Sequence, residues 1–384
     1  MRRSVSAAGL LTCLLCLTAC ASGTPGADRA TTAGDRHAAT PGPAGSAAPS
    51  EGPSAPEATA DPSAPPAGTT FTVAFAGDVH FEGRARARLA AGRADTALGP
   101  IAATLARADL AVLNLETAIT GRGAPEAKTY TFRTGPKALQ VLHDAGVDVV
   151  SMANNHAVDF GGDGLADTLA AKAASPLPVI GVGRDAAEAY APYVTTVNGV
   201  RVAVVAASQV GDLTNAKWRA GAHSPGIASA LDVPALLHAV AAARAQAPVV
   251  LVYLHWGEEG RACPTGPQQE IARRLSAAGA SAVVGTHAHT MLGAGMLGPT
   301  YVAYGFGNFL WYATSNYPGS DETGVTTVTF RADGRAVAER FTPARIDGRG
   351  VPLPQSGAAA GAALARRDGL RSCTGLGPVP KGGD

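Results

Sequence analysis

The sequence predicts an α/β fold, and two patterns indicate it. Short apolar runs rich in Val and Ala alternate along the chain with longer segments whose apolar residues recur every three or four positions. This alternation of strand and helix patterns is typical of sheets covered by helices. The strand segments are apolar at nearly every position, as expected of strands buried on both faces. Turn sequences at Asn198-Gly199 and Asp333-Gly334 add hairpins, which favours a mixed sheet or two packed sheets.

The predicted elements follow one another through a domain that extends from residue 70 to residue 347. Apolar runs predict strands at 70–78, 109–116, 147–153, 177–183, 193–208 (a hairpin), 248–256, 281–287 and 300–308. Helical periodicity with Gly or Pro at the ends predicts helices near 99–108, 136–146, 164–174, 233–247 and 267–279.

The segments outside this domain differ from it in composition. Residues 1–19 combine Arg2 and Arg3 with an apolar stretch too short to span a bilayer, as in a signal peptide. The sequence "LTAC" ending at Cys20 resembles the bacterial lipobox, which implies a lipid on Cys20. An ordinary signal peptide is the alternative. We expect an exported protein, lipid-anchored to the cell membrane on its extracytoplasmic side.

Two low-complexity segments flank the predicted domain. Residues 20–69 are almost entirely Ala, Pro, Gly, Ser, Thr and isolated charges, which predicts a disordered spacer. Residues 348–384 form a Gly/Ala/Pro-rich tail, in which we expect little regular structure beyond a short helix near 358–367.

The balance of charge argues against nucleic-acid binding, and the cysteine content leaves room for one disulfide. Lys and Arg number 31 and Asp and Glu 30, without a long basic tract, so nothing favours nucleic acid as a partner. After loss of a leader, Cys263 and Cys373 remain besides Cys20. Export permits a disulfide between them, but their spacing does not decide whether it forms.

Polar residues able to bind metal follow six of the predicted strands. They are Asp78 and His80; Asn114 and Glu116; Asn154, Asn155 and His156; His255, Glu258 and Glu259; His287 and His289; and Asn308. Ligands of open α/β sheets bind beyond the carboxyl ends of the strands, so these side chains are expected to converge. Imidazole, carboxylate and amide oxygen suit divalent cations, which predicts a metal site there.

The order of these residues resembles the signature of calcineurin-like metallophosphoesterases: D-x-H, a carboxylate, N-H, H, then G-x-H-x-H. The resemblance implies a sandwich of two mixed sheets flanked by helices, with two divalent ions (Zn, Mn, Fe or Mg). It implies that one ion is held by Asp78, His80 and His289, and the other by Asn155, His255 and His287, with Glu116 as the bridge. His156 would protonate a leaving group.

Within that superfamily, the segments "FAGDVHFEG", "LAVLNLETAIT", "VYLHWGEE", "GTHAHT" and "YGFGNFL" resemble the CapA family of poly-γ-glutamate capsule biosynthesis proteins. The likeness covers roughly residues 71–310, and residues 132–165 are its most specific part. Many relatives carry an apolar residue at the position of His80, and Ala288 stands where the family often has proline. Against the phosphoesterases, Glu116 replaces an aspartate.

The resemblance implies a protein for synthesis, export or attachment of an anionic polymer such as poly-γ-glutamate, through a metal-dependent hydrolase-type site. Membrane proteins of capsule synthesis and export would be its partners. A secreted metal-dependent phosphoesterase acting on a phosphoester substrate is one alternative. A non-catalytic surface module that binds the polymer is another.

Several polar residues near these motifs have two interpretations each. Asp159 either orients His156, which would make it part of the catalytic machinery, or holds the glycine turn that follows it. Arg133 either binds an anionic substrate or forms a surface ion pair. Asn154 either contacts substrate or pins the backbone. Asn308 is predicted to lie at the substrate side or to support the site from behind.

Overall fold

The computed structural model describes residues 66, 68–92, 94–312 and 317–380. The predicted signal peptide, Cys20 and nearly all of the predicted spacer lie outside those residues, so the predictions about export and anchoring stay predictions. Among the helices of the described residues, none has both the length and the apolar character needed to cross a bilayer.

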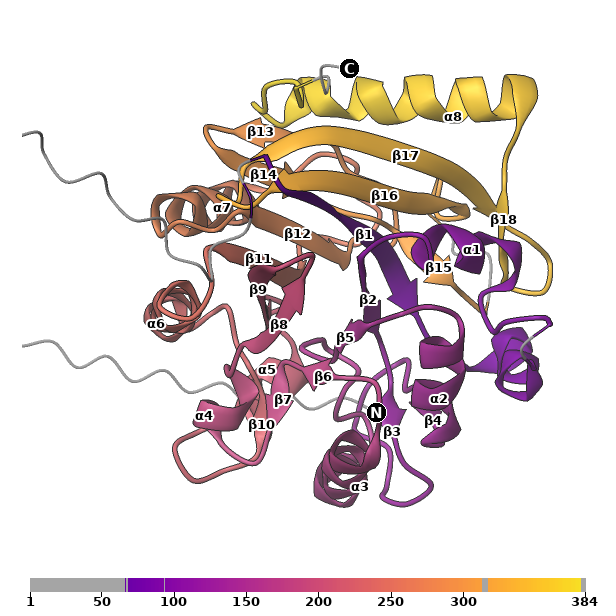
Figure 1. Ribbon diagram of the computed structural model, residues 1–384. Helices are drawn as coiled ribbons and strands as arrows, with labels where there is room; N and C mark the ends of the chain where they lie inside the picture. The colour runs from indigo at the N-terminus through magenta and orange to yellow at the C-terminus, as the bar shows by residue number, and fades with distance from the viewer. Residues whose placement is uncertain (1–65, 67, 93, 313–316, 381–384) are drawn as a thin grey trace, which may run out of the picture. The chain divides into compact units, whose positions relative to one another are not determined.

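Two large mixed sheets form the centre of the domain (Figure 1). Sheet I has eight strands, seven of them in the order β18 (Pro352–Pro354), β17 (Ala336–Ile346), β16 (Glu322–Arg331), β1 (Thr70–Val79), β2 (Leu110–Leu115), β5 (Val149–Ser151) and β6 (Val179–Ile180), with β15 (Asn308–Leu310) paired to β1. Sheet II has the order β13 (Ala294–Leu297), β14 (Thr300–Ala303), β12 (Ala282–His287), β11 (Val249–Trp256), β9 (Val200–Ser208) and β8 (Tyr193–Val197).

Short elements complete the fold. Two small ladders pair β3 (Ala118–Ile119) with β4 (Arg133–Thr134) and β7 (Val182–Gly183) with β10 (Gly226–Ile227). The helices are α1 (Ala102–Leu105), α2 (Lys137–Asp144), α3 (Gly161–Ala174), α4 (Ala186–Ala189), α5 (Leu213–Trp218), α6 (Val233–Arg244), α7 (Gly266–Ala277) and α8 (Gly357–Leu370). Three 3-10 turns cover Gly83–Ala90, Gly99–Ile101 and Arg371–Cys373.

Strand periodicity explains how the two sheets pack face to face. In β1, Val73 and Phe75 belong to the apolar cluster between the sheets, whereas Ala74 and Ala76 face the helices on the other side. Successive side chains of a strand point to opposite faces, so an all-apolar strand serves two cores. The Tyr253 hydroxyl of β11 also donates a hydrogen bond to the Ala76 carbonyl, 2.6 Å away, which ties sheet II to sheet I.

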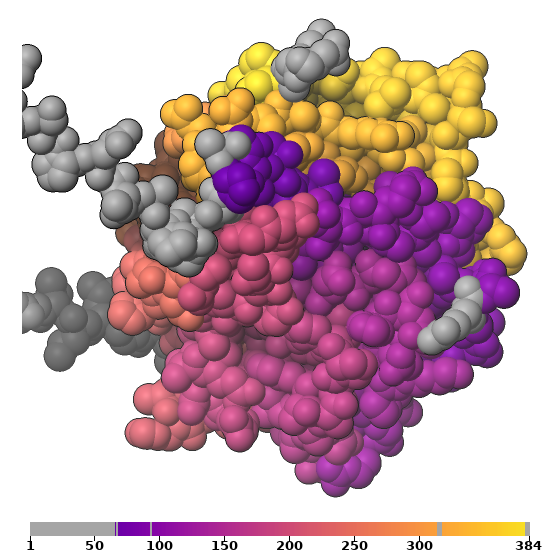
Figure 2. All heavy atoms as spheres, in the orientation of Figure 1, coloured from indigo at the N-terminus to yellow at the C-terminus, as the bar shows by residue number. Residues whose placement is uncertain are grey.

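The outer faces of both sheets are covered by helices. Side chains of α2 and α3 pack on sheet I, and side chains of α6 and α7 pack on sheet II. The predicted sandwich of two mixed sheets flanked by helices is therefore confirmed. On the face drawn in Figure 2, the yellow residues of α8 lie directly against the orange residues of β16 and β17.

The predicted hairpins are present as expected. Asn198 and Gly199 both have positive φ, 49° and 80°, as a two-residue turn between antiparallel strands requires, and they join β8 to β9. The turn that contains Gly334 joins β16 to β17.

The last described segment packs on the sheets. Strand β18 extends sheet I, helix α8 corresponds to the short helix predicted near 358–367, and Met296 pairs with Gly377. Cys263 and Cys373 form a disulfide, which settles the pairing that the spacing left open.

Candidate metal centre

The predicted ligands meet where parallel strands of both sheets end. In sheet I, Asp78 of β1 lies opposite Asn114 of β2 and Asn308 of β15. In sheet II, Trp256 at the end of β11 lies opposite His287 at the end of β12. Because the strands of each pair are parallel, their carboxyl ends reach the same edge.

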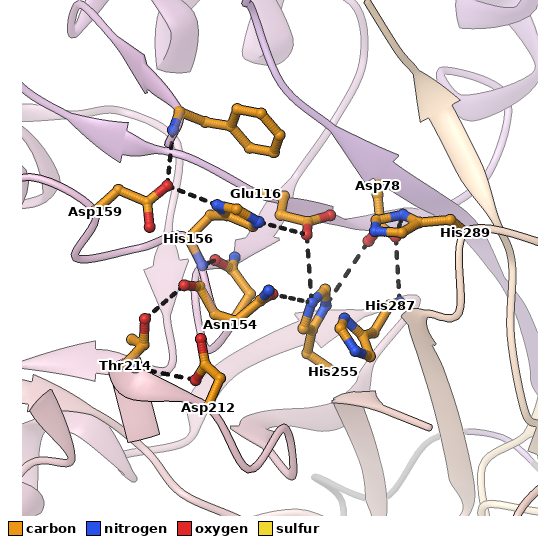
Figure 3. A network of polar contacts seen from close by, with 12 residues as sticks. Asp78, Glu116, Asn154, His156, Asp159, Asp212, Thr214, His255, His287 and His289 are labelled. Atoms are coloured by element: carbon orange, nitrogen blue, oxygen red, sulfur yellow. Dashed lines mark hydrogen bonds and ion pairs between the residues drawn. The ribbon is translucent and has the colours of Figure 1, made fainter. Parts of the chain in front are cut away.

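The geometry of strand β11 directs the side chain of His255 toward sheet I. His255 follows Tyr253 by two positions in β11, so both side chains leave the strand on the same face. Tyr253 lies in the apolar cluster between the sheets. His255 therefore points across that interface, toward Glu116 beyond the end of β2 (Figure 3).

Two overlapping groups of donor atoms share Glu116. One consists of Asp78, Glu116 and His289, and the other of Glu116, His255 and His287; within each group the ligand atoms lie within 4.8 Å of one another. All five side chains are buried. A carboxylate common to two adjacent groups is the arrangement needed to bridge two ions. Figure 3 shows these side chains converging.

Several donor atoms of this cluster are buried without a hydrogen-bond partner among the described residues. They are both carboxylate oxygens of Glu116 and Nδ1 of His287. Leaving a buried polar atom unpaired costs about 1–3 kcal/mol, and more when it is charged. Nε2 of His255 lies 2.7 Å from Oδ1 of Asn155 and 3.5 Å from Oε1 of Glu116. Three atoms that can bind a metal ion are therefore close together. These residues fit a divalent cation.

A neighbouring side chain fixes which nitrogen of His289 is able to bind a cation. Nδ1 of His289 lies 2.9 Å from Oδ1 of Asn308, which can only accept a hydrogen bond, so Nδ1 carries the proton and Nε2 is left unprotonated. The ring of His255 is held at both nitrogens: Nδ1 lies 3.0 Å from the Thr286 hydroxyl and Nε2 lies 2.7 Å from Oδ1 of Asn155. Residues that hold a ligating ring in this way commonly support metal sites.

Burial shifts the protonation of Asp78, Glu116, His255 and His287 toward their neutral forms. Desolvation, followed by the charge of Glu116, raises the pKa of Asp78 to about 6. Desolvation raises the pKa of Glu116 to about 7 and lowers that of His255 to about 4. The pKa of His287 also falls well below its usual value, mainly because the ring is buried. A bound cation would favour the charged forms of Asp78 and Glu116 and so would lower the pKa of both carboxyl groups.

The backbone is strained where the last two histidines lie. His287 has φ of 91° and His289 of 54°, a region that non-glycine residues seldom occupy. Such conformations cost about 1–3 kcal/mol each and concentrate at functional sites. The backbone N–H of His287 donates to Oδ2 of Asp78, 3.2 Å away, which helps hold the turn.

His80, the remaining predicted ligand of the first ion, has other surroundings, and its role as a ligand stays a prediction. It belongs to neither group of donors described above, and its Nδ1 accepts a hydrogen bond from the backbone N–H of Glu82 at 3.0 Å. Its ring stacks on Phe132 and meets the edges of Trp311 and Tyr312. The ring is thus held by aromatic neighbours, and we leave it out of the proposed ligands.

The two asparagines predicted to contact substrate are turned inward and fully buried. Nδ2 of Asn154 donates to Oδ1 of Asn114 and to the Leu115 carbonyl, and its Oδ1 accepts from the His156 backbone, so it pins the backbone. Asn308 holds His289 and donates to the Ser320 carbonyl. We therefore assign both to support of the site, in place of substrate contact.

Arg133 lies apart from the cluster, on β4. Its guanidinium stacks 4.6 Å above the centre of the Phe160 ring, and the residue is exposed. With Arg86 and Thr120 it lines a surface cavity of about 270 Å³. Its role in binding substrate stays a prediction.

His156 is held beside the cluster by a carboxylate. Its Nδ1 lies 2.6 Å from Oδ2 of Asp159, and its Nε2 lies 3.8 Å from Oε1 of Glu116. Asp159 also accepts from the Phe132 backbone N–H and from the Lys128 ammonium, both at 2.7 Å. This arrangement favours the interpretation of Asp159 as the residue that orients His156.

Sequence reasoning missed Lys128. Its ammonium also donates to the carbonyl of Asn155, which in turn accepts from the Thr214 hydroxyl at 2.6 Å. Lys128 thus ties the segment that carries Asn155 and His156 to the loop before β4. It lies in a polar loop with no local pattern, and nothing in the sequence around it signals this role.

The family model and the curated relatives indicate one family. The family model described as "Bacterial capsule synthesis protein PGA_cap" matches residues 72–313. The "PGA biosynthesis protein CapA" of Bacillus subtilis is 31% identical over 185 residues, which are 48% of this chain and 48% of that protein. The "Capsule biosynthesis protein CapA" of Bacillus anthracis is 28% identical over 226 residues, 58% of this chain and 53% of that protein. The chain spans about half the length of these curated relatives.

Solved structures with a similar arrangement share little sequence. A hypothetical protein from Thermus thermophilus has a TM-score of 0.45 and 20% identity, covering 71% of this chain and 99% of that one. A 5'-nucleotidase precursor from the same organism has a TM-score of 0.44 and 17% identity, covering 78% of this chain and 58% of that one.

Proposed function

Because this chain belongs to the bacterial capsule synthesis protein family PGA_cap, we propose that it serves the synthesis, export or attachment of an anionic surface polymer such as poly-γ-glutamate. The names of its Bacillus relatives, which refer to PGA and to capsule biosynthesis, support the choice of polymer. We also propose that the chain is exported and anchored through a lipid on Cys20. Membrane proteins of capsule synthesis and export would then be its partners.

The observation that carries an enzymatic role is the buried carboxylate of Glu116, which accepts no hydrogen bond from the described residues and is shared by two groups of potential metal ligands. We propose that one divalent ion is held by Asp78, Glu116 and His289. The second would be held by Glu116, Asn155, His255 and His287. Two such ions would polarise a substrate oxygen and lower the pKa of a shared water toward neutrality. The chain would then act as a metal-dependent hydrolase.

In this proposal His156 is the residue that protonates the leaving group. Because its Nδ1 is engaged by Asp159, its Nε2 faces the cluster. Burial lowers the pKa of His156 well below its usual value, so the ring is neutral at pH 7 in the ion-free protein. An anionic group of the substrate beside Nε2 favours the protonated ring. His156 would then give that proton to the leaving group.

Arg133 is the side chain best suited to hold the polymer's acidic groups. The guanidinium is exposed, stacks on Phe160, and has no carboxylate within salt-bridge distance among the described residues. Its planar fork of N–H donors matches carboxylate and phosphate. This is the basis for proposing an anionic polymer or phosphoester as substrate.

His156→Gln tests the proposed function. We expect hydrolysis of bis(p-nitrophenyl) phosphate with Mn²⁺ to fall about 10²- to 10⁴-fold, the usual contribution of a general acid. The amount of surface polymer made by cells carrying only the variant should fall too, while the metal content of the purified protein stays unchanged.

His143→Gln is the matched control, since His143 lies on the exposed face of α2. It should behave as the wild type in all three assays. If His156→Gln kept full turnover, His156 would not be the proton donor. If the wild type showed no turnover and His156→Gln kept polymer formation, the enzymatic role would be excluded and a non-catalytic polymer-binding module would be left.

A further inference from the structure

A third group of donor atoms lies beside the two already described, and it includes an exposed carboxylate. Ligand atoms of Glu259, His287 and His289 lie within 4.8 Å of one another. His289 belongs to the group of Asp78, and His287 belongs to the group of His255. Glu259 therefore stands next to one member of each proposed ion site, on the side that faces solvent.

The loop that carries Glu259 is fixed to the histidine segment. Directly after Glu259, the backbone N–H of Gly260 donates to the carbonyl of Ala288 at 2.8 Å. Ala288 lies between His287 and His289. The position of Glu259 relative to these two histidines is therefore set by the backbone and does not depend on the side chain alone.

A tyrosine from a remote segment orients the carboxylate. The Tyr317 hydroxyl donates a hydrogen bond to Oε2 of Glu259, 2.5 Å away. The Tyr317 ring also packs against Gly260, where an added Cβ would lie 2.5 Å from Cδ1 of the ring. An exposed glutamate side chain ordinarily loses conformational entropy when it binds a metal ion. The hydrogen bond from Tyr317 already restricts the Glu259 side chain, so less entropy is lost on binding.

The first ion site has room for a further protein ligand, because His80 is not part of its donor group. Without His80, the ion site of Asp78, Glu116 and His289 has three protein donors. Ligands on opposite sides of an ion with bonds of about 2.1 Å are about 4.2 Å apart. The ligand atoms of Glu259, His287 and His289 lie within 4.8 Å of one another, which is compatible with their binding the same ion.

We propose that Glu259 is an additional ligand of the metal centre, on its solvent side, and that Tyr317 positions it. This inference rests on the proposed two-ion site. A third carboxylate makes the donor set richer in oxygen, which favours harder cations such as Mn²⁺ and Mg²⁺. Because Glu259 is exposed, it would lie on the solvent side of the centre, and an acidic substrate would have to displace it or bind beside it.

Isothermal titration calorimetry, in which Mn²⁺ is added to the metal-free protein, tests whether Glu259 is a ligand. Glu259→Gln is expected to weaken one of the two binding steps tenfold or more. Tyr317→Phe should weaken the same step to a smaller extent, because it removes the positioning bond and leaves the carboxylate. Glu258→Gln is the matched control: it is the exposed neighbour, paired with Arg261, and should bind Mn²⁺ within twofold of the wild type.

The outcomes separate this inference from the proposed function. If the wild type binds two Mn²⁺ ions and Glu259→Gln stays within twofold of Glu258→Gln, Glu259 is no ligand and the inference fails alone. If the wild type binds no Mn²⁺, Zn²⁺ or Mg²⁺ under the same conditions, the metal centre itself fails, and this inference fails with it.

Discussion

Replacing Glu116 with glutamine is expected to stabilise the metal-free protein at pH 8 and to abolish the stabilisation that Mn²⁺ gives the wild type. Burial raises the pKa of Glu116 from 4.5 to about 7. The unfolded chain therefore releases this proton at lower pH than the folded protein does. Folding stability is lost as pH rises from about 4.5 to about 7, and the penalty stays constant above that.

The size of this effect follows from the shift in pKa. A difference of about 2.5 units, from 4.5 to about 7, corresponds to at most about 3.5 kcal/mol at about 1.4 kcal/mol per unit. Glutamine carries no charge at any pH, so the variant escapes the penalty at pH 8. At pH 4 both side chains are neutral, and the two proteins should differ little.

Thermal unfolding with EDTA and with Mn²⁺, at pH 4 and pH 8, measures both effects. Glu270→Gln is the control, because Glu270 is an exposed residue of α7 paired with Arg273. A Glu116→Gln protein that is less stable than the wild type at pH 8 in EDTA would show that the carboxylate has partners in the folded state, which contradicts its role as an ion ligand.

Replacing Gly77 with alanine is expected to destabilise the domain by about 3 kcal/mol or more. A Cβ at this position would lie 2.0 Å from the carbonyl oxygen of Gly307 and 2.9 Å from its carbon. Both are backbone atoms next to β15, so no side-chain rotation relieves the clash. Overpacking that displaces backbone commonly costs about 1–3 kcal/mol, and more when nothing can move.

The same substitution should also weaken the metal centre. The backbone N–H of Asp78 donates to the Gly307 carbonyl at 3.0 Å, so a shift of β1 from this strand moves Asp78. Denaturant unfolding and Mn²⁺ titration measure the two consequences. Gly121→Ala is the control, since an added Cβ there meets nothing within 4 Å. Equal stability of the two variants would contradict the close approach of the strands.

The parts of the fold that depend on local pattern could be predicted from the sequence. Parallel strands place their carboxyl ends at one edge, so residues such as Asp78 and Glu116 could be grouped without knowing the strand order. The Asn198-Gly199 turn could be recognised because both positions need positive φ. These features depend on neighbours along the chain.

Features that depend on remote contacts could not be predicted. His80 follows the D-x-H pattern of a ligand, but its ring is held by Phe132 and Trp311, which arrive from two other segments. Lys128 reaches the site from a loop with no distinguishing pattern. The pairing of Cys263 with Cys373 required the packing of residues 110 positions apart.

Elemental analysis of the purified protein tests most directly whether these side chains form a two-ion centre. We predict about two equivalents of divalent metal per chain in the wild type, and one or fewer in Asp78→Asn and in His287→Ala. Near-zero metal in the wild type after purification and incubation with Mn²⁺ or Zn²⁺, or equal metal content in all three proteins, would contradict the account.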